Sequence, residues 1–139
     1  MPRGTWAFDP GSGGLQIPER VKVATEQRLR EYTREHLAGR FTRLEIRFKG
    51  QFCYIDAYTE PAVPETWPPV GYPETREQMI ERLRNTPTHL CRLRYFGGDD
   101  RWGFAFYAYS SEKYVLSTFP SGEFLGKPDE ALAASALYL

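Results

Sequence analysis

The stretch "RLEIRFKGQFCYIDAY", residues 43–58, decides the fold because it predicts a tight β-hairpin. Apolar and charged residues alternate from Arg43 to Lys49, and a period of two indicates a strand with one buried face. Gly50 and Gln51 fit a two-residue type II′ turn, which requires glycine at its first position. A second strand follows the turn at once, so the hairpin needs no other part of the chain to define it.

The turn fixes which residues face each other across the hairpin. On the inner face the predicted pairs are Leu44 with Ala57, Ile46 with Ile55, and Phe48 with Cys53. On the outer face they are Arg43 with Tyr58, Glu45 with Asp56, and Arg47 with Tyr54. The outer face therefore places two carboxylates opposite each other, between two Arg–Tyr pairs.

Like charges directly opposite in a sheet cost free energy, so the pair of Glu45 and Asp56 needs an explanation. Arg43 and Arg47 could neutralise the carboxylates, helped by cation–π contacts with the neighbouring tyrosines. Alternatively, the carboxylates could share a proton or bind a metal ion. We favour a solvated lattice of arginine, tyrosine and carboxylate, because it needs no further residue. No additional metal ligand stands at a telling spacing, so we expect no metal.

A second hairpin is predicted from residues 89–96 and 101–109, around a four-residue loop. Its inner pairs are Cys91 with Phe106, Leu93 with Phe104, and Tyr95 with Trp102, which leaves Arg92 and Arg94 outside. Cys53 and Cys91 thus both face inward, where a buried thiol is inert. His36 and His89 each have a structural explanation. The sequence therefore predicts no catalytic residue.

The other segments complete an α+β pattern. Pro18 opens an amphipathic helix that reaches Leu37, and residues 75–78 match a capping box at the start of a second helix. Residues 113–126 predict further strands, and Pro128 opens a terminal helix. The expected fold is α+β: an antiparallel sheet of two hairpin units, αββ then αβββα, with helices packed on one face. The similar order of the two halves suggests a duplication, with convergent patterning as the alternative.

The chain divides into an irregular segment, residues 1–17, and a single α+β domain, residues 18–139. Between the two hairpin units lies a proline-rich stretch, residues 60–74, that carries Trp67 and Tyr72. A long loop with large rings either folds back on the core or is presented to a partner. We expect Trp67 and Tyr72 to pack back on the core.

Composition limits the classes of function. The chain has 139 residues, with 18 basic and 18 acidic side chains, which disfavours a strongly cationic nucleic-acid binder. Aromatic residues make up 15%, so some rings are expected to face water, a ligand or a partner. With two cysteines, no CxxC motif, no apolar leader and no stretch that would span a membrane, we expect a cytoplasmic protein without membrane contact.

The motifs "GQFCYIDAYTEP", "NTPTHLCRLRYFGGDDRWGFAFYAYS" and "GKPDEAL" resemble a group of small bacterial proteins with no established function. The resemblance covers most of the chain. It implies a bacterial cytoplasmic protein and assigns no functional residues.

These observations favour a non-catalytic binding domain that recognises a small ligand, a peptide or its own copy as a homodimer, without a cofactor. Its candidate binding residues are Arg43, Glu45, Arg47, Tyr54, Asp56, Tyr58, Trp67 and Tyr72. One alternative is a hydrolase or lyase that uses Glu45 and Asp56 with Arg47. Another is single-stranded nucleic-acid binding, because rings interleaved with arginines on a sheet suit base stacking.

Overall fold

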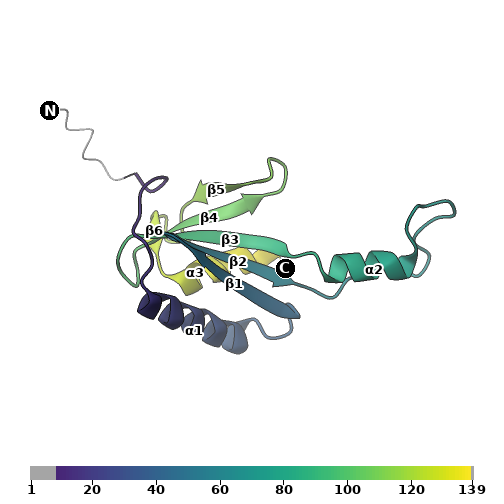
Figure 1. Ribbon diagram of the computed structural model, residues 1–139, viewed down its shortest axis with the longest axis horizontal. Coiled ribbons are helices and arrows are strands. Elements are labelled where there is room, and N and C mark those ends of the chain that lie inside the picture. Colours follow the sequence, from purple (N-terminus) through teal and green to yellow (C-terminus); the bar gives the residue numbers. More distant parts are fainter. Residues whose placement is uncertain (1–8, 139) are drawn as a thin grey trace.

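The computed structural model describes residues 9–138 and shows an antiparallel sheet, two helices against one face of it, and a third helix that stands apart (Figure 1). The elements are α1 (Glu19–His36), β1 (Arg43–Lys49), β2 (Phe52–Tyr58), α2 (Arg76–Arg84), β3 (Thr88–Tyr95), β4 (Trp102–Ala108), β5 (Lys113–Ser117), β6 (Leu125–Gly126), α3 (Pro128–Ser135) and a final 3-10 turn (Ala136–Tyr138). The α+β class with an antiparallel sheet is confirmed.

The first hairpin has the predicted register at every position. Strands β1 and β2 pair Ile46 with Ile55 and Glu45 with Asp56. Gly50 has a φ of 60°, and Gln51 has a negative φ, which is the pattern of a type II′ turn. The turn chemistry read from the sequence therefore sets the pairing of the whole hairpin.

The sheet is a meander in which the strands follow the order β1-β2-β3-β4-β5. The short strand β6 pairs with Trp102 and Gly103 of β4, whereas β5 pairs with residues 104–108. Strand β3 pairs along one edge of β4. Strands β5 and β6 therefore lie end to end along the opposite edge of β4. The three predicted inner pairs of the second hairpin are all present.

A β-bulge interrupts the pairing between β2 and β3. Ile55 is opposite Cys91, but the next residue, Asp56, is opposite His89, so Leu90 has no partner in the ladder. Leu90 and Cys91 are consecutive and are both buried. The extra residue turns His89 to the outer face of the sheet, beside Asp56.

The core lies between the inner face of the sheet and helices α1 and α3. Leu29 of α1 and Leu132 of α3 are fully buried against the sheet residues Cys53, Ile55 and Leu93. Both cysteines are free and buried, as predicted. No helix within residues 9–138 combines the length and the apolar character that a bilayer crossing requires.

Residues 10–18 form no helix or strand, yet they are attached to the sheet. The Leu15 N–H donates to the Tyr95 carbonyl at 2.8 Å, and the Ile17 N–H donates to the Gly50 carbonyl at 3.0 Å. Ile17 itself is buried in the core. Part of this segment crosses the outer face, because Arg94 donates to two of its carbonyls, those of Gly11 and Gly13. Residues 1–8 lie outside the described residues.

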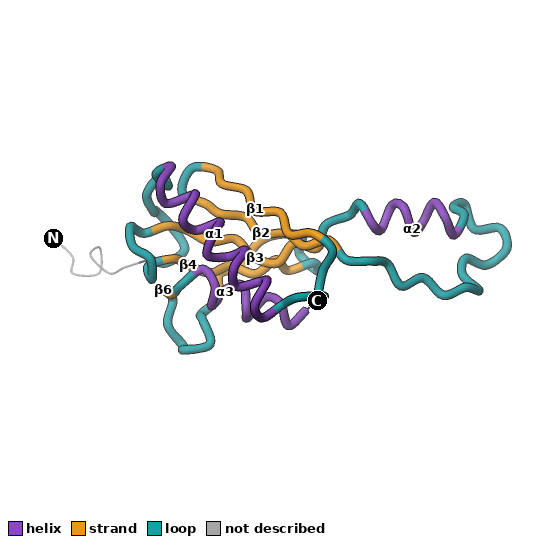
Figure 2. The backbone as a smooth tube through the Cα atoms, turned by 90° about the horizontal axis from the view of Figure 1, so that it is seen from below, coloured by secondary structure: helices purple, strands orange, loops and turns teal. Residues whose placement is uncertain are grey.

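Residues 59–87, which we call the arm, project away from the sheet (Figure 2). Helix α2 has at most slight contact with the sheet and with the other helices. The expectation that Trp67 and Tyr72 pack back on the core is wrong. Their rings pack on each other, with centroids 5.5 Å apart, and remain 42% and 41% exposed. Met79 is the only buried residue of α2, so the helix does not dock an apolar face on the core.

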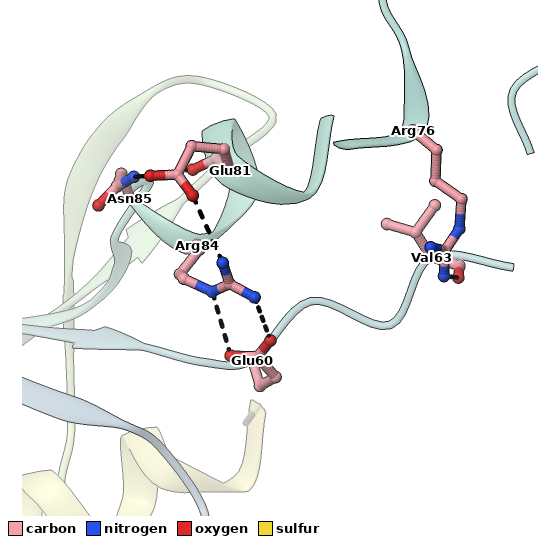
Figure 3. Close-up of polar contacts among 6 residues, drawn as sticks. All are labelled: Glu60, Val63, Arg76, Glu81, Arg84 and Asn85. Carbon is pink, nitrogen blue, oxygen red and sulfur yellow. Dashed lines mark hydrogen bonds and ion pairs between the residues drawn. The ribbon is translucent and has the colours of Figure 1, made fainter. Parts of the chain in front are cut away.

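Ion pairs and hydrogen bonds hold the arm together. Arg84 binds Glu60 through two nitrogens, at 2.7 and 3.3 Å, and also contacts Glu81 (Figure 3). Arg76 donates to the carbonyl of Val63 at 2.9 Å, which fastens the loop to the start of α2 (Figure 3). The ion pair of Arg84 and Glu60 thus joins the two ends of the arm to each other.

Candidate functional site

The outer face of the sheet carries the candidate site, because α1 and α3 cover only the opposite face. Six of the eight predicted binding residues lie on this face: Arg43, Glu45, Arg47, Tyr54, Asp56 and Tyr58. The other two, Trp67 and Tyr72, lie on the arm, so the structure does not bring them together with the hairpin residues.

Asp56 is the polar centre of the outer face. Its Oδ2 lies 3.1 Å from Nη2 of Arg47, and its Oδ1 lies 2.9 Å from Nδ1 of His89. The side chain is only 2% exposed. The expectation of a solvated carboxylate is therefore wrong for Asp56, because the neighbouring rings and the two basic groups exclude water from it.

Arg47 links the two carboxylates. Its Nε lies 3.4 Å from Glu45, which is 39% exposed. Its guanidinium carbon lies 5.2 Å from the centroid of the Tyr54 ring, and that of Arg43 lies 3.9 Å from the ring centroid of Tyr58. Neutralisation by arginine, supported by cation–π contacts, is thus the arrangement that the structure shows. A single arginine neutralises both carboxylates, since Arg43 makes no ion pair with another described residue.

His89 joins Asp56 to a group of tyrosines. Its ring centroid is 4.7 Å from that of Tyr107, and it stacks on Tyr109 at 6.3 Å with an interplanar angle of 17°. The backbone N–H of His89 donates to the hydroxyl of Tyr109 at 2.8 Å. This side-chain bond replaces a ladder hydrogen bond at the point where β3 leaves β4.

Sequence reasoning missed His89 as a site residue. Strict alternation back from Cys91 would turn His89 inward, and only the bulge at Leu90 turns it outward. The detectable signal was the pair of consecutive apolar residues Leu90 and Cys91, which breaks the alternation of the strand.

A hollow of about 340 Å³ opens where β3 and β4 part. Their last paired residues are Cys91 and Phe106, and beyond them the strands separate. The hollow is lined by Thr88, His89, Leu90, Phe106, Tyr107, Tyr109 and Ser135. We call it the His89 hollow. Its walls are mainly aromatic and aliphatic, with one imidazole and two hydroxyl-bearing aliphatic side chains.

A second hollow, of about 210 Å³, lies beside the outward-facing arginines of β3. It is lined by Pro10, Gly11, Arg92, Arg94, Gly103, Phe104, Ala105, Tyr114 and Leu116, and we call it the arginine hollow. Tyr114 lines the arginine hollow, and its ring centroid lies 5.0 Å from that of Tyr107 and 6.5 Å from that of His89, both of which line the His89 hollow. Burial, and the nearby charge of Asp56, raise the pKa of Tyr114 well above its ordinary value, so this phenol stays neutral.

The thiols do not contribute a nucleophile to the site. Burial raises the pKa of Cys91 to about 12, and it raises that of Cys53 as well. A thiol that keeps its proton is unreactive at neutral pH. Among the described residues, no group of three or more His, Cys, Asp or Glu side chains has the arrangement of a metal site.

Comparison with known proteins gives no family for this chain. No family model matches it, and neither a curated protein nor a solved structure is significantly similar to it. These comparisons add no support to the resemblance noted in the sequence, so a functional proposal has to rest on the geometry of the outer face.

Proposed function

We propose that the protein is a non-catalytic binding domain that takes a small, ring-bearing ligand in the gap where β3 and β4 part. The observation that carries the proposal is the His89 hollow, a gap of about 340 Å³ between two strands of an otherwise continuous sheet. Hollows from about 300 Å³ upward, with apolar walls and a few fixed polar groups, are typical of small-molecule sites.

The polar groups of the hollow are held in place before a ligand arrives. Asp56 binds Nδ1 of His89, so Nε2 is the polar atom that the imidazole has left, and it makes no hydrogen bond to another described residue. Tyr109 holds the backbone of His89. Since these groups need no reordering on binding, the hollow is preorganised for a ligand with a polar atom beside its ring.

A small ligand explains the shape of this face better than a macromolecule does. A second copy of the chain would need a large, complementary surface, whereas a ring-sized hollow alone buries too little area for a stable dimer. A single nucleic-acid strand would need a continuous cationic track. Here the buried carboxylate of Asp56 lies in the middle of the face.

The proposal is tested by NMR titration of the uniformly ¹⁵N-labelled protein with 3-phenyl-1-propanol, a neutral ring-bearing probe. We expect saturable shifts at residues 88–90 and 107–109. Replacement Tyr107→Ala removes one wall and weakens binding roughly fivefold, as expected for the loss of about 1 kcal/mol of aromatic contact. The matched control is Tyr58→Ala, which removes a ring from the same face away from the hollow and leaves the affinity unchanged.

Two further measurements separate the alternatives. Analytical ultracentrifugation at micromolar concentration reports self-association, and titration with a short oligothymidylate at two salt concentrations reports nucleic-acid binding. If the probe causes no saturable shifts while shifts across the face follow dimerisation or oligothymidylate binding, the small-ligand proposal is wrong. Equal losses in the Tyr107 and Tyr58 variants would also contradict it.

A hydrolase or lyase is the second candidate, and one observation favours it. Asp56 orients His89 through Nδ1, which is how a carboxylate prepares an imidazole to act as a general base through Nε2. Glu45 is not part of this arrangement, since it contacts only the outer edge of Arg47. Hydrolysis of p-nitrophenyl acetate tests this candidate: a catalytic His89 requires the rate to fall in His89→Gln, and equal rates would exclude the role for this ester.

A further inference from the structure

The arginine hollow has a feature that neutral-ring binding does not use: two guanidinium groups without a carboxylate between them. Arg92 and Arg94 alternate with inward residues on β3, so both point to the outer face, where they line the same hollow. Burial, together with the charge of Arg92, lowers the pKa of Arg94. The two cations therefore lie close enough to repel each other.

Arg94 already has hydrogen-bond partners. Its Nη1 donates to the Gly13 carbonyl at 2.8 Å, and its Nη2 donates to the Gly11 carbonyl at 3.1 Å. Asp9, on the same crossing segment, is close enough to add a weak favourable charge. Arg94 thus holds residues 11–13 in place as one wall of the hollow.

Arg92 is different, because its contacts leave its hydrogen-bond donors unused. Its guanidinium carbon lies 4.4 Å from the ring centroid of Phe52 and 5.3 Å from that of Tyr114. Within residues 9–138 it makes no ion pair and no hydrogen bond through its side chain. The two rings hold the guanidinium plane in place and contribute no acceptor. A fork of N–H donors held in one place is the arrangement that recognises a carboxylate or a phosphate.

The two hollows are close enough to serve one molecule. Tyr114 lines the arginine hollow, and its ring packs on Tyr107 and His89, which line the other. Three residues separate His89 from Arg92 along β3, which is roughly 10 Å at the rise of a strand. A phenyl-sized ring in the His89 hollow with an acidic group two or three bonds away covers about half of this distance, and the extended side chain of Arg92 covers the rest.

We propose that Arg92, supported by Arg94, binds the anionic group, a carboxylate or a phosphate, of a ligand whose ring occupies the His89 hollow. This inference rests on the proposed function and names its ligand class: a small aromatic acid. The anion relieves the repulsion between the two arginines and takes up the free donors of Arg92.

The experiment compares 3-phenylpropionate with the neutral 3-phenyl-1-propanol, two probes that differ in the terminal group. Binding is followed at residues 92 and 114 for the arginine hollow, and at residues 89 and 107 for the ring. We expect the acid to bind about tenfold more tightly, because a charge-assisted hydrogen bond contributes roughly 1.5 kcal/mol or more. Arg92→Gln abolishes this preference, and Arg92→Lys, which keeps the charge and loses the fork, retains part of it.

The matched control is Arg43→Gln. Arg43 also lies over a tyrosine on the outer face, but it lines neither hollow. The preference for the acid should survive in this variant. Inorganic phosphate and acetate, each titrated alone at constant ionic strength, show which anion Arg92 prefers. If phosphate or acetate binds the parent protein and this binding is lost in Arg92→Gln, the result supports the anion site without any contribution from a ligand ring.

The outcomes separate this inference from the proposed function. Equal affinity for acid and alcohol, with shifts at residues 89 and 107, overturns the anion site and leaves ring binding intact. A preference for the acid that survives Arg92→Gln also overturns the assignment to Arg92. Anion binding at Arg92 without binding of either phenyl probe supports the anion site and overturns the proposed function. If no probe binds, both are wrong.

Discussion

At the scale of single residues, Asp56 shows how neighbours change the role of a side chain. It is paired with Glu45 across the hairpin, yet Asp56 is buried and Glu45 is half-exposed. The difference comes from the third strand, because His89 binds Asp56 and does not bind Glu45. We therefore expect two carboxylates that look equivalent in the hairpin to contribute unequally to stability.

Asp56→Asn should destabilise the fold, and Glu45→Gln should not. Asp56→Asn leaves the buried group with weaker partners, so we expect a loss of about 1–3 kcal/mol in the free energy of unfolding. Glu45 belongs to an exposed pair, for which changes of about 0.5 kcal/mol or less are usual. Urea denaturation of the two variants beside the parent protein measures both. Equal losses would show that the outer pair is solvated on both sides.

The raised pKa of Cys91 predicts how the free energy of unfolding depends on pH in the alkaline range. Its pKa is about 12 in the folded protein, well above that of an exposed thiol at about 8.5, so above pH 9 only the unfolded chain releases this proton. The folded state then binds more protons than the unfolded state, and stability falls as pH rises from about 9 to 12. The full contribution of the thiol is present below pH 8.5.

The measurement is the free energy of unfolding from pH 7 to 11 for the parent protein and for Cys91→Ala. Between pH 9 and 11 the parent should lose about 1.4 kcal/mol per pH unit more than the variant. From pH 7 to 8 the two profiles should run parallel. Profiles that stay parallel up to pH 11 would mean that the thiol is not protected from ionisation.

At the scale of elements, the contrast is between helices that depend on the core and one that does not. Helices α1 and α3 bury leucines against the sheet, whereas α2 has little packing and is stabilised at its ends by hydrogen bonds of its own residues. Its N-terminus carries the predicted capping box, with Thr75 Oγ1 accepting from the Gln78 N–H at 3.1 Å and Gln78 Oε1 accepting from the Thr75 N–H at 2.9 Å. A helix without packing depends on such caps.

Thr75→Ala should therefore loosen α2 without loosening the domain. The lost cap costs about 1 kcal/mol of local helix stability, which raises amide exchange rates in α2 roughly fivefold. The urea midpoint of the sheet should not change, because α2 has at most slight contact with the sheet. Hydrogen exchange followed by NMR reports both regions in one experiment. A matching fall in protection of the β3 amides would show that the arm and the sheet unfold together.

At the scale of the whole molecule, the arm is an insertion between two neighbouring strands. Ala57 pairs with Thr88, so the chain leaves the sheet and returns to it at adjacent positions. A hairpin loop of a few residues could close the same gap. The core, which holds α1, α3 and the sheet, is complete without residues 59–87.

Replacing residues 59–87 with a four-residue Gly/Asn loop should leave the fold intact. We expect the free energy of unfolding to change by about 1 kcal/mol or less, since closing a shorter loop costs less entropy. The comparison variant is Leu132→Ala, in the full-length chain, which removes a buried side chain and should cost about 2–5 kcal/mol. Circular dichroism and urea denaturation measure both. Loss of the cooperative transition in the arm replacement would show that the arm belongs to the core.

Local sequence determined the first hairpin, the second hairpin, the inward cysteines and the capping box of α2. Each depends on residues within a few positions of one another: Gly50 sets a turn, the turn sets a register, and the register assigns every side chain to a face. The short loop at residues 97–100 acts in the same way for the second hairpin.

Only the tertiary structure decided the position of His89, the burial of Asp56, and the direction of the arm. All three depend on contacts between segments far apart in the chain. The bulge forms where β3 must match β2, and its effect is to bring His89 to a carboxylate 33 positions earlier. The arm stands free because its polar groups find partners within the arm itself. Periodicity within a strand or a loop carries no information about such long-range partners, which is why the centre of the candidate site appeared only in three dimensions.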